Sequence, residues 1–316
     1  MKSLFRLIRL PNLVIVALTQ YALQYAILLP ELVKIAQKPL LPDFQFGLLV
    51  CSTVLIAAGG YVVNDIEDVE IDRLNKPEHK RIVERIYPLP ISWKIYWFIT
   101  ILGFLISLYL AVFIHDFVQL AIYPAAVTLL WAYSKWFKRQ FLIGNLVVAG
   151  FCAFVAWVVF YAQSLYQYEH YYMKDIFYTL TPKYINVPES AKTVFIGYAI
   201  FAFISTLFRE IIKDMEDLTG DKAQGCRTLP IVLGINKAKV IASIVGFLFL
   251  LAILFFSFVV KDNYLKLFFL NITITLPVCY ALFLLIKAKE KADYARLSKL
   301  AKLIMLSGLI FILIMK

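Results

Sequence analysis

The stretch Ser52–Arg73 reads STVLIAAGGYVVNDIEDVEIDR and passes directly from an apolar run into a run of acidic residues. Its apolar part belongs to a run over residues 44–64, which is long enough to cross the ~30 Å hydrocarbon core of a bilayer as a helix. Gly59 and Gly60 lie just before the acidic residues and permit close approach of a neighbouring helix. The stretch therefore predicts a membrane-spanning helix whose end carries a cluster of carboxylates.

The same arrangement occurs a second time. The stretch Arg209–Asp221 (REIIKDMEDLTGD) follows an apolar run over residues 193–209. Both clusters contain the pattern D-x-x-D-x-x-x-D, which comprises Asp65, Asp68 and Asp72 in the first and Asp214, Asp217 and Asp221 in the second. This spacing places three carboxylates on one stripe of a helix, unless Gly220 ends the second helix first. Like charges on one stripe repel each other, so the pattern predicts a bound cation.

The composition sets the fold class. Of the 316 residues, 62% are apolar and 17% are charged, against about 45–50% and about 25% in soluble domains, so both disorder and an ordinary water-facing fold are excluded. Apolar runs long enough to span a bilayer occur at residues 12–30, 44–64, 91–114, 117–133, 141–163, 193–209, 238–260, 264–286 and 297–315. We predict an all-α, polytopic membrane helix bundle with nine transmembrane helices, forming a single integral-membrane domain over residues 1–316.

The charges predict the orientation in the membrane. The chain has 32 Lys and Arg against 21 Asp and Glu, and the basic residues lie in short clusters between the apolar runs. With nine spans, 24 basic residues fall on the side of the N-terminus and 8 on the other side, as the positive-inside rule requires. We expect the cell inner (plasma) membrane, with the N-terminus and both acidic clusters cytoplasmic and the C-terminus outside. Nothing indicates a nucleic acid or an obligate protein partner.

The acidic clusters favour one class of ligand. Sites made only of carboxylates suit hard cations, and Mg²⁺ is commonly shared between one or two carboxylates and the phosphates of a substrate. Because both clusters face the same side, they could hold a diphosphate through bridging Mg²⁺. Basic side chains would bind its remaining oxygens, and the candidates are Arg73, Lys76, Arg81, Lys138, Arg139, Lys222 and Arg227. The alternative reading, two solvated helix ends, accounts less well for two copies with identical spacing.

At these residues the chain resembles the UbiA-type intramembrane prenyltransferases. Their first motif, N-D-x-x-D-x-x-x-D, is matched by residues 64–72, and their second motif by residues 214–221 followed by T-L-P at 228–230. The chain is also similar to the family in the loop after the fourth span, through Tyr133-Ser134, Lys138-Arg139 and Gly144-Asn145. The nine predicted spans agree with the all-helical fold of this family.

The resemblance implies a transferase that uses Mg²⁺ to bind a polyprenyl diphosphate and moves the prenyl group onto an acceptor. It implies that the Mg²⁺ ligands come from Asp65, Asp68, Asp72, Asp214, Asp217 and Asp221, with Asp68, Asp72, Asp217 and Asp221 as the principal catalytic carboxylates. Lys138 and Tyr133 are further catalytic candidates, Tyr133 near the reacting carbon. The diphosphate would be contacted by Asn64, Arg73, Lys76, Arg139 and Lys222.

Two questions stay open at this stage. The acceptor is either an aromatic quinone precursor or a prenylglycerol-phosphate-type lipid, and the family also serves haem and chlorophyll precursors. A polytopic transporter with an acidic cation-binding site is the alternative class, although such sites usually lie near mid-membrane on broken helices. The tyrosine-rich segment 164–192 is expected to belong to an aromatic belt at the outer membrane interface.

Overall fold

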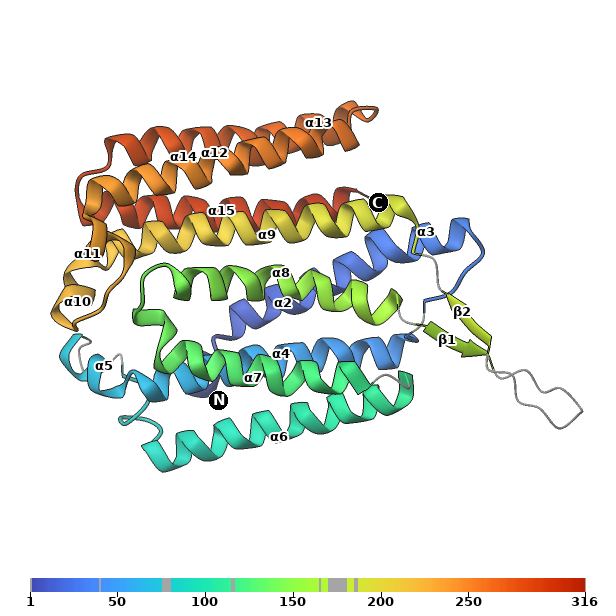
Figure 1. Ribbon diagram of the computed structural model, residues 1–316, viewed down its shortest axis with the longest axis horizontal. Helices are drawn as coiled ribbons and strands as arrows, with labels where there is room; N and C mark the ends of the chain where they lie inside the picture. The colour runs from blue at the N-terminus through green and yellow to red at the C-terminus, as the bar shows by residue number, and fades with distance from the viewer. Residues whose placement is uncertain are drawn as a thin grey trace, which may run out of the picture.

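The computed structural model describes residues 2–39, 41–75, 81–114, 117–164, 166–169, 181–184 and 187–315. Long helices lie side by side and neighbours in the chain run in opposite directions (Figure 1). The elements are α1 (Lys2–Leu7), α2 (Leu10–Ala22), η1 (Leu23–Leu28), α3 (Leu29–Lys34), α4 (Asp43–Glu67), α5 (Val69–Asn75), α6 (Leu89–Ile114), α7 (Phe117–Lys135), η3 (Phe137–Arg139), α8 (Ile143–Ser164), β1 (Tyr166–Glu169), β2 (Thr181–Tyr184), α9 (Glu189–Glu216), α10 (Leu218–Ala223), α11 (Leu229–Leu233), α12 (Ile235–Val259), α13 (Tyr264–Leu270), η4 (Asn271–Thr275), α14 (Leu276–Lys287) and α15 (Lys291–Ile314).

The predicted all-α membrane bundle is confirmed, with a small correction to the number of spans. Within the described residues, eight helices are long and apolar enough to cross a membrane. They correspond to every predicted run except 117–133. That run forms α7, a helix of 19 residues with Pro124 inside it, which packs against α4 and α6 but is not among the eight. The predicted count of nine is therefore one too high by this measure.

The outer surface of the bundle is apolar, as a lipid environment requires. Phe98 and Phe255 are 69% and 73% exposed, because a helix in lipid satisfies its backbone hydrogen bonds internally and needs no polar outer face. Between helices, Gly60 permits close contact of α4 with α7, since a Cβ at this position would lie 2.9 Å from Leu130 Cδ1.

Two of the long helices contain a widened turn, and each has a proline as its cause. The π-helical segments η1 and η4 end two residues before Pro30 and Pro277, which occupy the second positions of α3 and α14. Proline lacks the N–H that would complete the preceding turn, and its ring clashes with the carbonyl four residues earlier. A π-turn absorbs this clash without breaking the helix.

The short elements divide between the two ends of the bundle. Helices α5, α10 and α11 lie together at one end, while the antiparallel hairpin β1–β2 lies at the other (Figure 1). Within the tyrosine-rich segment 164–192, residues 165, 170–180, 185 and 186 lie outside the described residues. The end with α5 and α10 carries both acidic clusters and therefore contains the candidate site.

Candidate active site

Each acidic motif has the same bend at its second aspartate. Helix α4 ends at Glu67, and Asp68 has φ −92° and ψ 0° before α5 begins. Helix α9 ends at Glu216, and Asp217 has φ −92° and ψ 3° before α10 begins. The helical stripe is therefore interrupted at Asp68 and at Asp217, although each of these residues still accepts a backbone hydrogen bond from the residue four positions later. The break falls at the second aspartate in both motifs and not at the glycine of the second, which lies inside α10.

One cavity brings the two motifs together. It has a volume of about 920 Å³ and is lined at its polar end by the predicted residues Asn64, Asp68, Asp72, Tyr133, Lys138, Arg139, Asp214, Asp217 and Asp221. Deeper in the bundle its wall is mainly apolar and is formed by α2, α4, α8, α9 and α15, with residues such as Ile56, Phe151, Val158 and Phe201. The cavity thus joins a group of carboxylates to an apolar chamber, which suits a ligand with an anionic head and a hydrocarbon tail.

Four of the predicted residues are not placed in this cavity. Asp65 forms an ion pair with Arg9. Arg73 lies outside and binds Glu84, with Nε 3.0 Å from each carboxylate oxygen, and this contact raises the pKa of Arg73 and lowers that of Glu84. Lys222 is exposed and does not line the cavity, and Lys76 lies outside the described residues. The role of Asp65 as a metal ligand and the contacts of Arg73, Lys76 and Lys222 with a diphosphate remain predictions.

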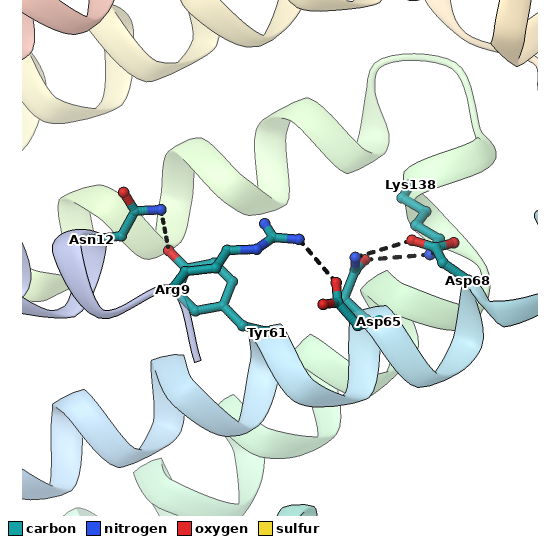
Figure 2. A network of polar contacts seen from close by, with 7 residues as sticks. Arg9, Asn12, Tyr61, Asp65, Asp68 and Lys138 are labelled. Carbon is teal, nitrogen blue, oxygen red and sulfur yellow. Dashed lines mark hydrogen bonds and ion pairs between the residues drawn. The ribbon is translucent and has the colours of Figure 1, made fainter. Parts of the chain in front are cut away.

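Lys138 binds the first motif directly. Its ammonium group pairs with the Asp68 carboxylate and donates a hydrogen bond to Asn64 Oδ1 at 3.3 Å (Figure 2). The Asn64 amide in turn donates to Asp68 Oδ2 at 3.0 Å. Burial lowers the pKa of Lys138, and the Asp68 charge partly offsets this effect. The three side chains therefore form a charge-assisted network at the polar end of the cavity.

Close backbone packing fixes the position of Lys138. The residue lies in η3, and α8 begins shortly after it, with Leu142 in the left-handed region at φ 56°. A Cβ on Gly144 would lie 2.8 Å from Lys138 Cα and 2.9 Å from Phe137 O, so glycine is required at this point. The Arg227 N–H donates to Arg139 O at 2.8 Å, which ties this turn to the segment after the second motif.

Arg9 is a cavity residue that the sequence analysis did not single out. Its guanidinium lies 4.8 Å from the centre of the Tyr61 ring and donates to Asp65 Oδ1 at 3.1 Å (Figure 2). Asn12 donates to the Tyr61 hydroxyl at 3.3 Å. The sequence offered only a general signal, because Arg9 belonged to the basic N-terminal segment that the positive-inside rule already explained.

The second motif accepts a hydrogen bond from a neutral partner, and Lys213 acts on it through its charge without forming an ion pair among the described residues. The Asn145 amide donates to Asp214 Oδ2 at 2.8 Å. Within the part of the chain that the structure describes, no ion pair reaches Asp217 or Asp221. Burial, together with the Asp217 charge, raises the pKa of Asp221 to about 6. Unbalanced negative charge is therefore concentrated on this motif.

The donor set fits Mg²⁺ shared with a phosphate ligand. The described residues contain no preformed group of three acidic, histidine or cysteine side chains arranged around a metal position. Mg²⁺ does not need one, because it keeps several waters and uses one or two carboxylates together with substrate phosphates. Asp217 and Asp221 supply such carboxylates from one side of the cavity, and Asp68 and Asp72 supply them from the other.

Comparison with known proteins identifies the family. The model of the UbiA prenyltransferase family matches residues 32–306, and the chain belongs to this family of integral-membrane proteins. Digeranylgeranylglyceryl phosphate synthase of Saccharolobus solfataricus is 33% identical over 210 residues, which cover 65% of this chain and 63% of that protein. The first relatives thus match over about three fifths of their own length.

Solved structures show the same fold. A structure of digeranylgeranylglyceryl phosphate synthase in membranes has a TM-score of 0.68 at 23% identity and covers 99% of this chain and 98% of its own. A UbiA homologue from Archaeoglobus fulgidus, bound to GPP and Mg²⁺, has a TM-score of 0.57 at 14% identity and covers 98% of this chain and 99% of its own. At these identities the likeness concerns the fold alone.

Proposed function

We propose that the protein is a Mg²⁺-dependent intramembrane prenyltransferase that moves a polyprenyl group from its diphosphate to a prenylglycerol-phosphate-type lipid. One observation carries this proposal: the two acidic motifs and Lys138 line the polar end of a cavity whose remaining wall is mainly apolar. Such a shape suits a diphosphate at the polar end and its prenyl tail in the chamber.

The charges suit the breaking of the allylic C–O bond. When bound, Mg²⁺ would stabilise the charge that grows on the departing diphosphate. Lys138 and Arg139 line the same region and would add charge-assisted hydrogen bonds to the same oxygens. The acceptor oxygen forms the new C–O bond to the prenyl carbon, the bond to the diphosphate breaks, and the acceptor proton leaves with the products. Donors fixed before the reaction lower the barrier because they need no reorganisation.

The chamber protects the reacting carbon from water. Its apolar wall excludes the solvent that would otherwise hydrolyse the allylic centre. Tyr133 lines the cavity and interacts electrostatically with Asp68 and Asp214, one from each motif. This position, between the two motifs, supports its proposed place beside the reacting carbon, where an aromatic face can stabilise positive charge.

The relatives favour one of the two acceptors that the sequence left open. The first relatives are named digeranylgeranylglyceryl phosphate synthases, and this name points to a prenylglycerol phosphate rather than an aromatic quinone precursor. For orientation, we propose that the motif-bearing end and the N-terminus are cytoplasmic and the C-terminus is outside, in the cell inner membrane, because most basic residues lie at the motif-bearing end.

The test is transfer by the purified full-length protein in detergent. A radiolabelled polyprenyl diphosphate is offered with a prenylglycerol phosphate or with 4-hydroxybenzoate, each with Mg²⁺ or with EDTA. We expect label in the phosphorylated lipid only, and only with Mg²⁺. Label on the aromatic acid would show that the acceptor is an aromatic compound and not a prenylglycerol phosphate. Absence of all transfer, combined with cation flux in liposomes, would support the transporter alternative instead.

A further inference from the structure

A second set of cations lines the cavity away from the acidic motifs. Arg209 on α9 and Lys302 on α15 both belong to the wall of the chamber. Each lies within a helix that is long and apolar enough to cross the membrane. Ionisable residues inside such helices are costly and are usually retained for function. Lys138 and Arg139 already serve the acidic motifs, so these two cations need another explanation.

The two residues lie at a similar depth. Helices α9 and α15 are side by side and run in opposite directions (Figure 1). They meet where Gly308 lies against Phe201, because a Cβ on Gly308 would be 2.2 Å from Phe201 Cε1. Arg209 lies eight residues after Phe201 in α9, and Lys302 lies six residues before Gly308 in α15. Because the two helices are antiparallel, both residues are displaced from this contact in the same direction. At 1.5 Å per residue their levels differ by only about 3 Å.

Arg209 has unused hydrogen-bonding capacity at this level. Its Nη1 donates to Glu210 Oε1 at 2.5 Å, but its buried Nε has no partner. The buried hydroxyl of Thr206, less than one turn away on α9, also lacks a partner and lines the same wall. Lys302 is exposed and forms no ion pair within the described part of the chain, so the cost of burial concerns Arg209 and Thr206. Unpaired polar atoms at a buried site are costly unless a ligand satisfies them.

The ligand chemistry follows from these groups. Glu210 balances the charge of Arg209, so Lys302 leaves the group with a net charge of +1, which suits an anion. We treat the anion as separate from the donor diphosphate, because the principal metal-ligand candidate Asp217 is eight residues from Arg209 and thus about 12 Å along the helix.

We propose that Arg209, Thr206 and Lys302 form a subsite for the phosphate headgroup of the lipid acceptor. The inference rests on the proposed function and adds the residues that select a phosphorylated acceptor. Phosphate oxygens would accept hydrogen bonds from the Arg209 guanidinium and the Lys302 ammonium, both of which belong to lining residues, with the Thr206 hydroxyl buried beside them. The same contacts would hold the acceptor in the chamber beside the donor.

The test uses the full-length protein in detergent without any donor, so that no catalysis is needed. Binding of a prenylglycerol phosphate and of the corresponding unphosphorylated prenylglycerol is measured by tryptophan fluorescence titration. Lys302→Met is expected to weaken binding of the phosphorylated lipid about tenfold and to leave binding of the alcohol unchanged, with Lys302→Arg retaining most of the affinity. Lys299→Met is the matched control, because Lys299 is on the same helix but does not line the cavity.

A second variant tests Arg209 without leaving a buried charge. The double variant Arg209→Gln with Glu210→Gln keeps the net charge. It is expected to lose about as much preference for the phosphorylated over the unphosphorylated lipid as Lys302→Met does. The inference is overturned if Lys302→Met binds the phosphorylated lipid as the wild type does, or loses both lipids equally. It is also overturned if the variant raises the KM of the donor rather than that of the acceptor. A wild-type protein that transfers no prenyl group, yet selects the phosphorylated lipid through Lys302, would overturn the proposed function and leave the subsite standing.

Discussion

The two acidic motifs have the same backbone shape but different surroundings. Asp68 and Asp217 have nearly the same φ and ψ, and each lies between a long helix and a short one. Asp68 is paired with Lys138, whereas Asp214 receives only the neutral amide of Asn145. The first motif therefore has much of its charge balanced before any ligand arrives, and the second does not. The comparison suggests that the second motif provides most of the attraction for the metal ion.

The largest effect is expected from removal of the middle carboxylates. Asp68→Asn and Asp217→Asn should each lower prenyl transfer by about 10²–10³-fold, which is the effect of losing one main electrostatic contact. Calorimetric titration with Mg²⁺ alone should separate the two variants. Asp217→Asn should weaken Mg²⁺ binding more strongly, because Asp68 is already paired. Equal losses of Mg²⁺ affinity would contradict the comparison.

The next effect concerns the cation that distinguishes the first motif. Lys138→Met should lower transfer about 10²-fold, since a donor to the diphosphate is lost. It should also increase the thermal stabilisation by Mg²⁺, because the freed Asp68 carboxylate gains a cation. Differential scanning fluorimetry with and without Mg²⁺ measures this shift. Lys135→Met is the control, because Lys135 lies against Trp131 and outside the cavity. An unchanged Mg²⁺ shift in Lys138→Met would refute the pairing argument.

A smaller effect should follow from moving Lys138 without replacing it. Gly144→Ala places a methyl group within 3 Å of two backbone atoms of the η3 turn, so this turn must shift. We expect about a tenfold loss of kcat and a destabilisation of about 1–3 kcal/mol, as for other overpacked sites. Gly150→Ala in the same helix meets no atom within 4 Å and should be neutral or slightly stabilising. Similar transfer rates in both variants would show that the position of Lys138 tolerates this shift.

The smallest effect is a pH dependence at the second motif. Burial and Asp217 raise the pKa of Asp221 from 3.8 to about 6, so its carboxylate is fully formed only above that pH. The apparent affinity for Mg²⁺ should thus fall several-fold as the pH decreases from 7 to 5. Asp221→Asn should bind Mg²⁺ more weakly but with a flatter profile in this range. Titration at several pH values checks this, and an unaltered slope in the variant would assign the proton to another group.

The long apolar runs predicted nearly the whole fold. A helix in lipid must satisfy its own backbone, so hydropathy and length suffice to locate it. The interruption of both motifs at the second aspartate was not predictable from the spacing. The spacing suggested a continuous stripe, and glycine was the only visible helix breaker. In the structure the interruption lies at Asp68 and Asp217, where each long helix is followed by a short one.

The site was predicted where residues are close in the sequence and missed where they are not. Asp68 and Asp217 belong to local motifs, and each could be found from spacing alone. Arg9 and Arg73 are both basic residues on the side of the membrane predicted to be cytoplasmic. Charge patterning could not tell which of them lines the cavity. Arg9 lines the cavity, whereas Arg73 turns away to Glu84. This choice depends on the path of α2 relative to α4, which involves contacts between distant parts of the chain.

The sequence by itself determined a helical membrane protein with two carboxylate motifs at one end, because hydropathy and i, i+3, i+4 spacing are local properties. The tertiary structure decided which charges meet. It placed Lys138 on Asp68, left Asp217 and Asp221 without an ion pair among the described residues, and brought Arg209 and Lys302 to a similar depth in the chamber. The physical reason is that electrostatic interactions depend on distance in space, and helix packing alone sets the distances between residues far apart in the chain.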